Sequence, residues 1–333
     1  MILAADIGGT SSRLAVFDVM AGQLRRVVQE RYASAGHDRL EEIVRVFQSS
    51  HRLSIDRACF AVAGPVIGGR SDAPNLPWSV DASLLAREIG LASVGLLNDL
   101  EANAYGIPEL GPEDFAVLNA GSRTAAGNQV VISAGTGLGV AGIYWDGHDH
   151  HPFATESGHA DFAPNNGLEL DLLHHLRRKH GHVSWERVVS GPGLVSVYEF
   201  LRDRGRGSEP PWLRDALTRD DPAAVISRAA QDGSSDICRR ALDLFTSVYG
   251  AQTGNVALGV LATGGVYVGG GIAPKIIDAL RSGAFMEAFL AKGRLRSLLE
   301  AMPVRVILND LTALLGAARW AARLAMRAGH ARA

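Results

Sequence analysis

A glycine-rich turn near the start of the chain has the composition of a phosphate-binding site. An apolar segment at residues 2–5 leads into Asp6, and the turn Gly-Gly-Thr-Ser-Ser at residues 8–12 follows before a second strand-like segment begins at Arg13. Backbone N–H groups and hydroxyls at such a hairpin tip, with little side-chain bulk around them, suit phosphate oxygens. The Asp6 carboxylate at its mouth could hold a hydrated Mg²⁺ between protein and phosphate. A tight Gly-Gly hairpin without a ligand has the same local sequence.

The chain repeats this arrangement in its second half. Apolar residues 130–134 run into Gly-Thr-Gly-Leu-Gly at residues 135–139, and a strand-like segment follows at 140–145. Two such hairpins, one in each half, indicate a duplicated domain with two phosphate clamps facing each other. A third glycine cluster at residues 269–271 suits close approach of a flat ligand to the backbone, although a plain strand-to-helix turn has the same pattern.

Other phosphate-binding motifs are absent or poorly placed. The sequence contains no G-x-x-x-x-G-K-[ST], which excludes a P-loop. The G-x-G-x-x-G at residues 137–142 is followed by β-branched and aromatic residues in place of a helix, which argues against a dinucleotide-binding fold.

Polar residues at the ends of predicted strands supply acid–base and hydroxyl-binding chemistry. Asn98 and Asp99 follow an apolar strand, at the edge where open α/β sheets bind ligands. An aspartate there could accept a proton from a sugar hydroxyl that attacks phosphorus, and Asn98 could hold neighbouring hydroxyls. Asp99 could equally cap the next helix. Glu156 and His159 lie in a glycine-containing loop and could bind vicinal hydroxyls, while Glu186 is typical of a first-turn acid that favours a helix dipole.

Composition and charge indicate a cytoplasmic globular protein. The 333 residues carry a formal net charge of −2 with a sequence pI of about 6.6, so neither nucleic acid nor an anionic membrane is an expected partner. Two cysteines, Cys59 and Cys238, cannot form a disulfide framework or a cysteine-rich zinc loop, so we expect no structural zinc. No apolar run approaches about 20 residues, and the first residues lack the basic segment of a signal peptide.

Hydrophobic periodicity predicts an α/β organisation with a mixed five-stranded sheet in the first half. Strands are expected at residues 1–7, 13–19, 24–32, 57–63 and 93–98, with helices at 38–50, 81–90 and 100–106. The second half is expected to combine its glycine hairpin and a turn at 146–152 with helices at 167–180, 191–202, 222–231 and 235–261, a strand at 304–308 and a helix at 312–326. Residues 106–112 are the best candidate for a hinge between the halves.

Taken together, the motifs resemble the bacterial glucokinase family, in that family's order and over almost the whole chain. They are DIGGT at residues 6–10, LND at 97–99, GTGLG at 135–139, ESGHADFAPN at 156–165, GHVSWERVVSGPG at 181–193 and GGGIAP at 269–274. The resemblance implies a duplicated ribonuclease H-like fold of the actin and hexokinase type, with mixed five-stranded sheets. It also implies phosphorylation of the glucose 6-hydroxyl with ATP and Mg²⁺. A small domain at residues 1–108 and 309–328, a large domain at 109–308, an active-site cleft between them and often a homodimer would accompany this activity.

The resemblance assigns a role to each candidate residue. Asp99 would be the general base, and Asp6 would reach Mg²⁺ through water. Glucose hydroxyls would be held by Asn98, Asp99, Glu156, His159, Glu186 and Asn75. The nucleotide would be bound by Ala5, Asp6, Ile7, Gly8, Gly9, Thr10, Ser11, Gly135, Thr136, Gly137, Gly139, Gly270 and Gly271.

Two positions depart from the family pattern. The family usually has Asn where Ser11 stands and Gly where Ser157 stands. Ser11 keeps a hydroxyl donor, so we expect ATP binding to survive. Ser157 lies between two proposed sugar ligands and therefore bears on hexose selectivity.

Three other classes share parts of this pattern. A ROK-type kinase acting on another hexose or an N-acetylhexosamine usually carries a cysteine-rich zinc loop. A sugar-responsive transcriptional regulator on the same scaffold would need a DNA-binding domain before the first strand, and we expect none because only five residues precede Asp6. A non-enzymatic actin-like ATPase would lack a sugar-binding set such as Asn98, Glu156, His159 and Glu186.

Overall fold

The computed structural model describes residues 1–72 and 78–330, which divide into two units. Unit 1 contains residues 1–113 and the chain from Asn309 onward, and unit 2 contains Asp114–Leu308. The chain therefore leaves unit 1 once and returns to it to form the last helix.

Unit 1 is built on a five-stranded mixed sheet, as the sequence predicts, and its strand order is β3-β2-β1-β4-β7. Its strands are β1 (Ile2–Ile7), β2 (Ser11–Met20), β3 (Gln23–Ala33), β4 (Arg57–Val62) and β7 (Gly95–Asn98), and a separate ladder joins β5 (Arg70–Ser71) to β6 (Val80–Asp81). Its helices are α1 (Leu40–His51), α2 (Ala82–Ile89), α3 (Asp99–Gly106) and α12 (Thr312–His330).

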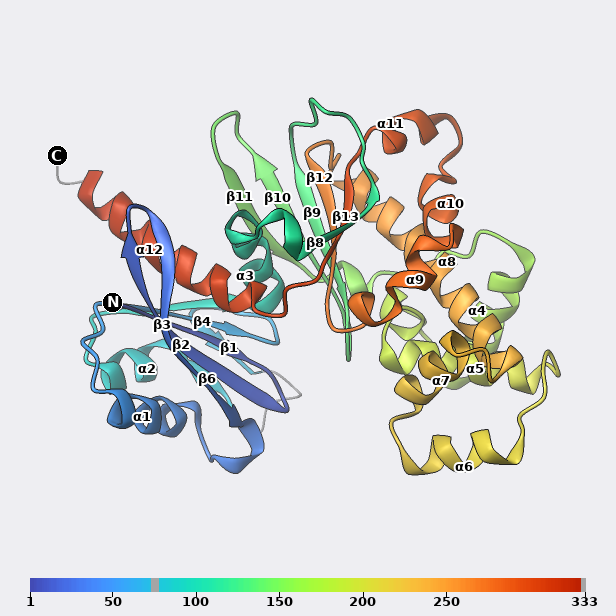
Figure 1. The fold of residues 1–333 in the computed structure, drawn as a ribbon, viewed down its shortest axis with the longest axis horizontal. Helices are drawn as coiled ribbons and strands as arrows, with labels where there is room; N and C mark the ends of the chain where they lie inside the picture. The colour runs from blue at the N-terminus through green and yellow to red at the C-terminus, as the bar shows by residue number, and fades with distance from the viewer. Residues whose placement is uncertain (73–77, 331–333) are drawn as a thin grey trace. The chain divides into compact units, whose positions relative to one another are not determined.

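The side chains of β1 alternate between the two faces of this sheet, and each face packs against different helices. Leu3, Ala5 and Ile7 belong to a core shared with α1 and α2, whereas Ile2 and Ala4 belong to a core shared with α3 and α12. Successive side chains of a strand point to opposite faces, so one apolar strand can serve both cores. Figure 1 shows α1 and α2 on one side of the sheet and α12 on the other.

Helices α3 and α12 approach closely because glycine stands at two of their contacts. A Cβ at Gly316 would overlap the carbonyl oxygen of Ala102, and one at Gly106 would overlap that of Thr312. Any side chain at these positions would have to push the two helix backbones apart. This contact holds α3, which begins with Asp99, against the last helix of the chain.

The segment predicted as a hinge is packed within unit 1 over its first half. Ile107–Glu109 forms a 3-10 turn, and the Glu109 carboxylate pairs with Arg319 of α12. The chain passes into unit 2 only after Glu113. A hinge at residues 106–112 stays a prediction.

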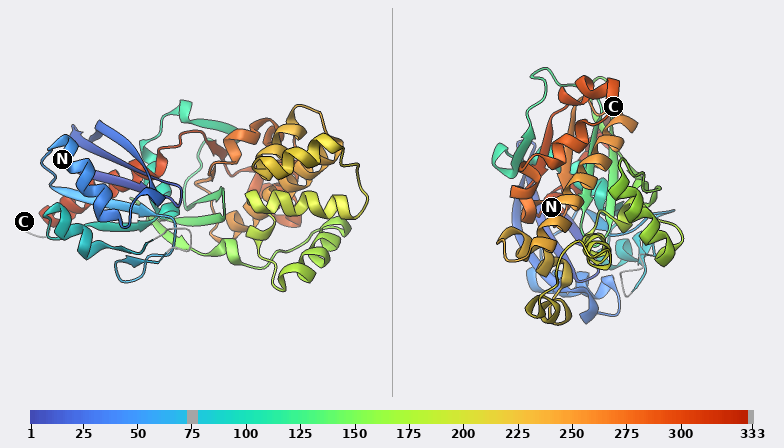
Figure 2. Two further views of the ribbon diagram at one scale, coloured as in Figure 1. Left: turned by 90° about the horizontal axis from the view of Figure 1, so that it is seen from below. Right: turned by 90° about the vertical axis from the view of Figure 1, so that its right-hand side faces the viewer.

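Unit 2 is built on a six-stranded mixed sheet with the strand order β11-β10-β9-β12-β13-β8. Its strands are β8 (Phe115–Asn119), β9 (Gln129–Ala134), β10 (Leu138–Trp145), β11 (His150–Thr155), β12 (Gly265–Gly269) and β13 (Val304–Ile307). Its helices are α4 (Gly167–His180), α5 (Gly191–Asp203), α6 (Pro211–Arg219), α7 (Pro222–Gln231), α8 (Asp236–Gly259), α9 (Ile277–Arg281), α10 (Ala284–Leu290) and α11 (Arg296–Glu300). The long helix α8 packs against α5, α7 and α10, as Figures 1 and 2 show. Among the described helices of either unit, none has both the length and the apolar character needed to cross a bilayer.

Five strands of this sheet repeat the order and directions found in unit 1. In unit 1, β1 is antiparallel to β2 and parallel to β4, while β2–β3 is antiparallel and β4–β7 parallel. In unit 2, β9 is antiparallel to β10 and parallel to β12, while β10–β11 is antiparallel and β12–β13 parallel. This is the pattern that a duplicated domain would give, and the ribonuclease H-like duplication itself stays a prediction.

Several elements of unit 2 differ from the sequence expectations. The expected five-stranded sheet is wrong for this unit, because β8 adds a sixth strand that pairs only with β13 at the sheet edge. Part of the predicted turn at 146–152 belongs to β11, whose pairing with β10 is a tertiary contact that local composition does not specify. Helices α6, α10 and α11 have no counterpart among the helices expected from the sequence.

Replacing Gly316 with Ala should destabilise unit 1, because the new methyl group would meet backbone atoms that cannot swing aside. We expect the free energy of unfolding to fall by about 1–3 kcal/mol or more, measured by urea denaturation. In the matched Gly36→Ala variant the new Cβ would meet only the Ala33 side chain at 3.9 Å, and its effect should stay within about 0.5 kcal/mol. A Gly316→Ala variant as stable as the parent would contradict this account of the helix contact.

Candidate active site

The first glycine turn joins β1 to β2, as the sequence predicts. The two strands pair as far as Ile7 opposite Ser12, and the Gly8 N–H donates to the Ser11 carbonyl across the turn at 3.1 Å. Thr10 is exposed at the tip. The turn therefore offers backbone groups and the Thr10 hydroxyl to a ligand, with the half-buried Ser11 beside them.

A pair of buried serines supports this turn from the interior of unit 1. The Ser34 hydroxyl donates to the Gly8 carbonyl at 2.6 Å, and the Ser12 hydroxyl lies 3.0 Å from that of Ser34. Both side chains are fully buried. The expectation that Ser12 presents its hydroxyl at the tip is therefore wrong, because β2 already begins at Ser11 and directs Ser12 inward. The sequence gives no local signal for Ser34, because it comes from the 3-10 turn Ser34–Gly36 after β3.

Asp6 lies beside Arg13, its partner in the β1–β2 register. Burial raises the pKa of Asp6, the Arg13 guanidinium lowers it and the Asp310 carboxylate raises it, so that the pKa stands above its ordinary value. A nearby cation would favour the ionised form.

The described residues fit Mg²⁺ as an ion held largely by water and phosphate. Among them, no group of three or more His, Cys, Asp or Glu side chains could hold a metal ion. Mg²⁺ keeps several of its waters and is usually bound through one or two carboxylates together with substrate phosphates. Asp6 beside a turn suited to phosphate fits that mode.

Asn98 caps α3 in place of Asp99. Its Oδ1 accepts hydrogen bonds from the N–H groups of Leu100 at 2.9 Å and Glu101 at 3.4 Å. Its Nδ2 donates to the Gly64 carbonyl at 3.0 Å. These bonds fix the orientation of the amide and use one of its two hydrogens.

Asp99 is the first residue of α3, half-buried, with its Oδ1 2.9 Å from the Leu100 N–H. Because Asn98 occupies the cap position, the alternative role of Asp99 as the cap falls away. An acidic side chain in the first helical turn is favoured by the helix dipole. Asn75, the remaining predicted sugar ligand of the first half, lies outside the described residues.

In unit 2 the second glycine turn joins β9 to β10. The Gly135 N–H donates to the Gly137 carbonyl at 2.9 Å, and Thr136 is exposed at the tip. The start of α5 is attached to this turn, because the Gly191 N–H donates to the Gly135 carbonyl at 2.8 Å. Ser190 caps that helix, because its hydroxyl accepts a hydrogen bond from the Gly193 N–H at 3.0 Å.

The backbone of Leu138 joins this turn to two segments that carry predicted sugar ligands. Its N–H donates to Glu186 Oε2 at 2.9 Å, and a Cβ at Gly137 would lie 2.5 Å from the same oxygen. Its carbonyl oxygen lies so close to Gly158 that a Cβ there would overlap it. Glycine at both positions therefore allows the carboxylate and the 3-10 turn Ser157–His159 to close on the start of β10.

Glu156 precedes this 3-10 turn and His159 is its last residue, and the two side chains form a loose pair. The carboxylate Oε2 and the imidazole Nε2 are 3.9 Å apart, and the two side chains are 64% and 61% exposed, which leaves them open to a ligand. The loop is tied to the segment carrying Glu186 by the Trp185 N–H, which donates to the Ala160 carbonyl at 3.0 Å. The structure thus brings the loops bearing Glu156, His159 and Glu186 together within unit 2.

The third glycine cluster packs against the strand that leads into the second turn. Gly270 has a φ of +84°, and a Cβ there would overlap the carbonyl oxygen of Ala134. The Ile272 N–H donates to that same carbonyl at 3.3 Å. A Cβ at Gly271 would meet no atom of the described residues within 4 Å. Gly270 is therefore required by packing, and Gly271 is the position with open space for a ligand.

Three other predicted nucleotide-binding residues lie within strands. The side chains of Ala5 and Ile7 are fully buried in β1, so only their backbone atoms could reach a ligand. Gly139 pairs with Ser133 in the β9–β10 ladder and belongs to the strand after the turn.

Comparison with known proteins identifies the family. A family model described as glucokinase matches residues 3–324. A glucokinase from Nostoc sp. is 41% identical over 340 aligned residues, which cover 97% of this chain and 99% of that protein. The chain belongs to the glucokinase family. The resemblance carried by the sequence motifs is thereby confirmed.

Solved structures agree with this assignment. A glucokinase from an Antarctic psychrotroph matches with a TM-score of 0.85 at 31% identity, covering 97% of this chain and 98% of that one. A ROK-family glucokinase from Streptomyces griseus shares the fold, with a TM-score of 0.64 at 22% identity over 97% of this chain and 99% of that one. The mixed α/β architecture is therefore common to glucokinases of both kinds.

For the serine pair beneath the first turn we predict which of two substitutions lowers the stability of the protein more. Ser34→Ala should lower the free energy of unfolding by about 1–3 kcal/mol, because it leaves the Gly8 carbonyl and the Ser12 hydroxyl without their partner. Ser12→Ala should cost less, since Ser34 can still donate to Gly8. Urea denaturation of both variants measures the order, and a Ser12→Ala loss equal to or above that of Ser34→Ala would contradict the assigned bond directions.

Proposed function

We propose that this chain transfers the terminal phosphoryl group of ATP to the 6-hydroxyl of glucose, releasing glucose 6-phosphate and ADP, with Asp99 as general base. Membership of the glucokinase family supports the reaction and both substrates. The observation that carries the proposal is the 2.9 Å bond from the Leu138 N–H to Glu186. It joins a carboxylate suited to sugar hydroxyls to the end of a turn suited to phosphate.

Glucose is held in this proposal by its hydroxyls. Carboxylates accept hydrogen bonds from hydroxyls, and imidazole can donate or accept them. Glu186 uses one oxygen on Leu138, and its carboxylate has a second oxygen for the sugar. Glu156 and His159 act from the adjoining loop. The remaining contacts come from Asn98 and Asn75.

The phosphates of ATP are held by the two glycine turns. Backbone N–H groups and the hydroxyls of Thr10, Ser11 and Thr136 act at the tips, and Gly271 leaves room for the adenosine. Neither turn contains a lysine or arginine. Mg²⁺ that arrives with the nucleotide would supply the positive charge, and Asp6 would hold it through water.

Asp99 accepts the proton of the 6-hydroxyl as that oxygen attacks phosphorus. Phosphoryl transfer needs little covalent chemistry from the protein. Its rate therefore depends mainly on alignment of the reacting groups and on neutralisation of the phosphate charge. The cap formed by Asn98 fixes the first turn of α3 and with it the backbone of Asp99. Asn98 is thus a positioning residue as well as a hydroxyl-binding one.

The proposed reaction goes with a particular domain organisation of the chain. The matching strand order of the two sheets supports a duplicated ribonuclease H-like fold. The small domain predicted at residues 1–108 and 309–328 and the large one predicted at 109–308 would close on the substrates and exclude water, with residues 109–113 grouped with the first of them in the structure. Family membership supports a homodimer in the cytoplasm.

Asp99→Asn should reduce turnover by about 10²–10⁴-fold, because the amide cannot accept the hydroxyl proton. Glucose-dependent ADP release in a coupled assay measures the effect. Glu101→Gln is the matched control, since Glu101 lies on the same helix and burial raises its pKa. A loss of less than about threefold for Asp99→Asn would remove Asp99 from its role.

Glu156→Gln and His159→Ala should each weaken glucose binding by about tenfold, the value of one lost hydrogen bond to a charged or polar partner. Calorimetric titration with glucose measures the affinities. Asp161→Asn, in the same loop with a 90% exposed side chain paired to His182, should leave glucose affinity unchanged. Unaltered affinity in both test variants would refute the sugar-site assignment.

A further inference from the structure

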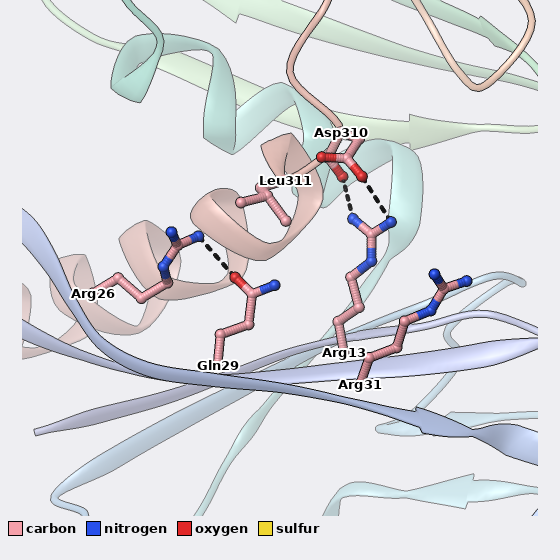
Figure 3. Close-up of a pocket in the computed structure, with 6 residues that line it drawn as sticks. All are labelled: Arg13, Arg26, Gln29, Arg31, Asp310 and Leu311. Atoms are coloured by element: carbon pink, nitrogen blue, oxygen red, sulfur yellow. Dashed lines mark hydrogen bonds and ion pairs between the residues drawn. The ribbon is translucent and has the colours of Figure 1, made fainter.

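A cavity of about 470 Å³ in unit 1 is lined largely by positively charged side chains. Figure 3 shows its lining residues, Arg13, Arg26, Gln29, Arg31, Asp310 and Leu311. A volume of this size lies within the range of small-molecule sites, about 300–1,000 Å³. None of the proposed sugar or nucleotide ligands is among these residues.

Strand geometry gathers three arginines on one face of the sheet. Arg13 of β2 stands directly opposite Arg31 of β3. In a regular strand Arg26 would point to the other face. A bulge in the β2–β3 ladder lies between Arg31 and Arg26 and shifts the register, so Arg26 points to the same face as Arg31. A β-bulge re-aims side chains in this way. In Figure 3 the side chains of Arg13, Arg26, Gln29 and Arg31 rise from the same face toward the segment that begins α12.

The positive charge of this cavity is only partly neutralised. Arg13 bonds to the Asp310 backbone carbonyl and pairs with its carboxylate, both at 2.8 Å, and it also neighbours Asp6. Arg26 donates to Gln29 Oε1 at 2.7 Å, a neutral partner. Arg31 is exposed and pairs with no carboxylate of the described residues. Like charges directly opposite each other in a sheet destabilise it, so this arrangement gains when an anion enters.

We propose that this cavity binds a small molecule with two phosphoryl groups, one at Arg26 and one at Arg31. The planar guanidinium fork matches phosphate oxygens in pairs, which a lysine cannot do. The two arginines are five positions apart on β3, about 15 Å between α-carbons, so their side chains suit two separated anionic groups better than a single ion. Gln29 lies between them with an amide N–H, and Leu311 provides an apolar wall.

The test is calorimetric titration of the full-length protein with fructose 1,6-bisphosphate as the probe. Glucose and the non-hydrolysable nucleotide AMPPNP are kept saturating, so that the phosphate-binding turns are filled. We expect the parent protein to bind the probe and the double variant Arg26→Gln/Arg31→Gln to bind it at least about tenfold more weakly. Arg25→Gln removes the same charge from the next position on β3, which faces away from the cavity, and should keep the parent affinity.

Three results would overturn the proposal. The first is the absence of probe binding when AMPPNP is present. If the probe does bind when AMPPNP is left out, this result would place it in the nucleotide site. The second is an equal loss of affinity in Arg25→Gln, which would indicate general attraction between charges. The third is equal binding of inorganic phosphate or citrate, which would exclude recognition of two phosphoryl groups. Should the double variant fail to fold in a thermal unfolding scan, Arg31→Gln alone, at an exposed position, must show a weaker affinity than the parent.

Discussion

The bond from the Leu138 N–H to the Glu186 carboxylate is the contact on which the site in unit 2 depends. While this bond is kept there is no room for a side chain at Gly137, and the carbonyl of the same residue, Leu138, leaves none at Gly158. One residue of strand β10 therefore fixes the turn suited to phosphate, the carboxylate of Glu186 and the loop of Glu156 and His159. A substitution in any one of these three segments should therefore shift the other two.

Unit 1 supports its own turn by different means. There the carbonyl of Gly8 is held by the Ser34 hydroxyl, which is backed by Ser12, and both serines are fully buried. A ligand that binds at the tip cannot replace these bonds. The first turn is thus held by the interior of its unit, whereas the second is held by a carboxylate that we also assign to the sugar. On that assignment, we expect the second turn to be the one that responds to glucose.

Local features of this chain could be predicted from its sequence, and contacts between distant segments could not. Both glycine turns, the sheet of unit 1 and the bounds of α7 follow from apolar periodicity and turn residues, which act over a few positions. The edge strand β8 and the support from Ser34 depend on partners far along the chain. Asn98 and Asp99 are both good caps in composition. Asn98 is the cap because its backbone is extended, with φ of −64° and ψ of 147°. No local sequence pattern specifies that conformation.

A crystal structure of this protein with glucose and AMPPNP tests the central claim most directly. We predict that Glu186 Oε2 stays within hydrogen-bond distance of the Leu138 N–H while the other oxygen of that carboxylate contacts a glucose hydroxyl. The 6-hydroxyl should lie within hydrogen-bond distance of the Asp99 carboxylate. Glucose bound away from Glu186, a Glu186 released from Leu138 when sugar is present, or a 6-hydroxyl out of reach of Asp99 would contradict the account.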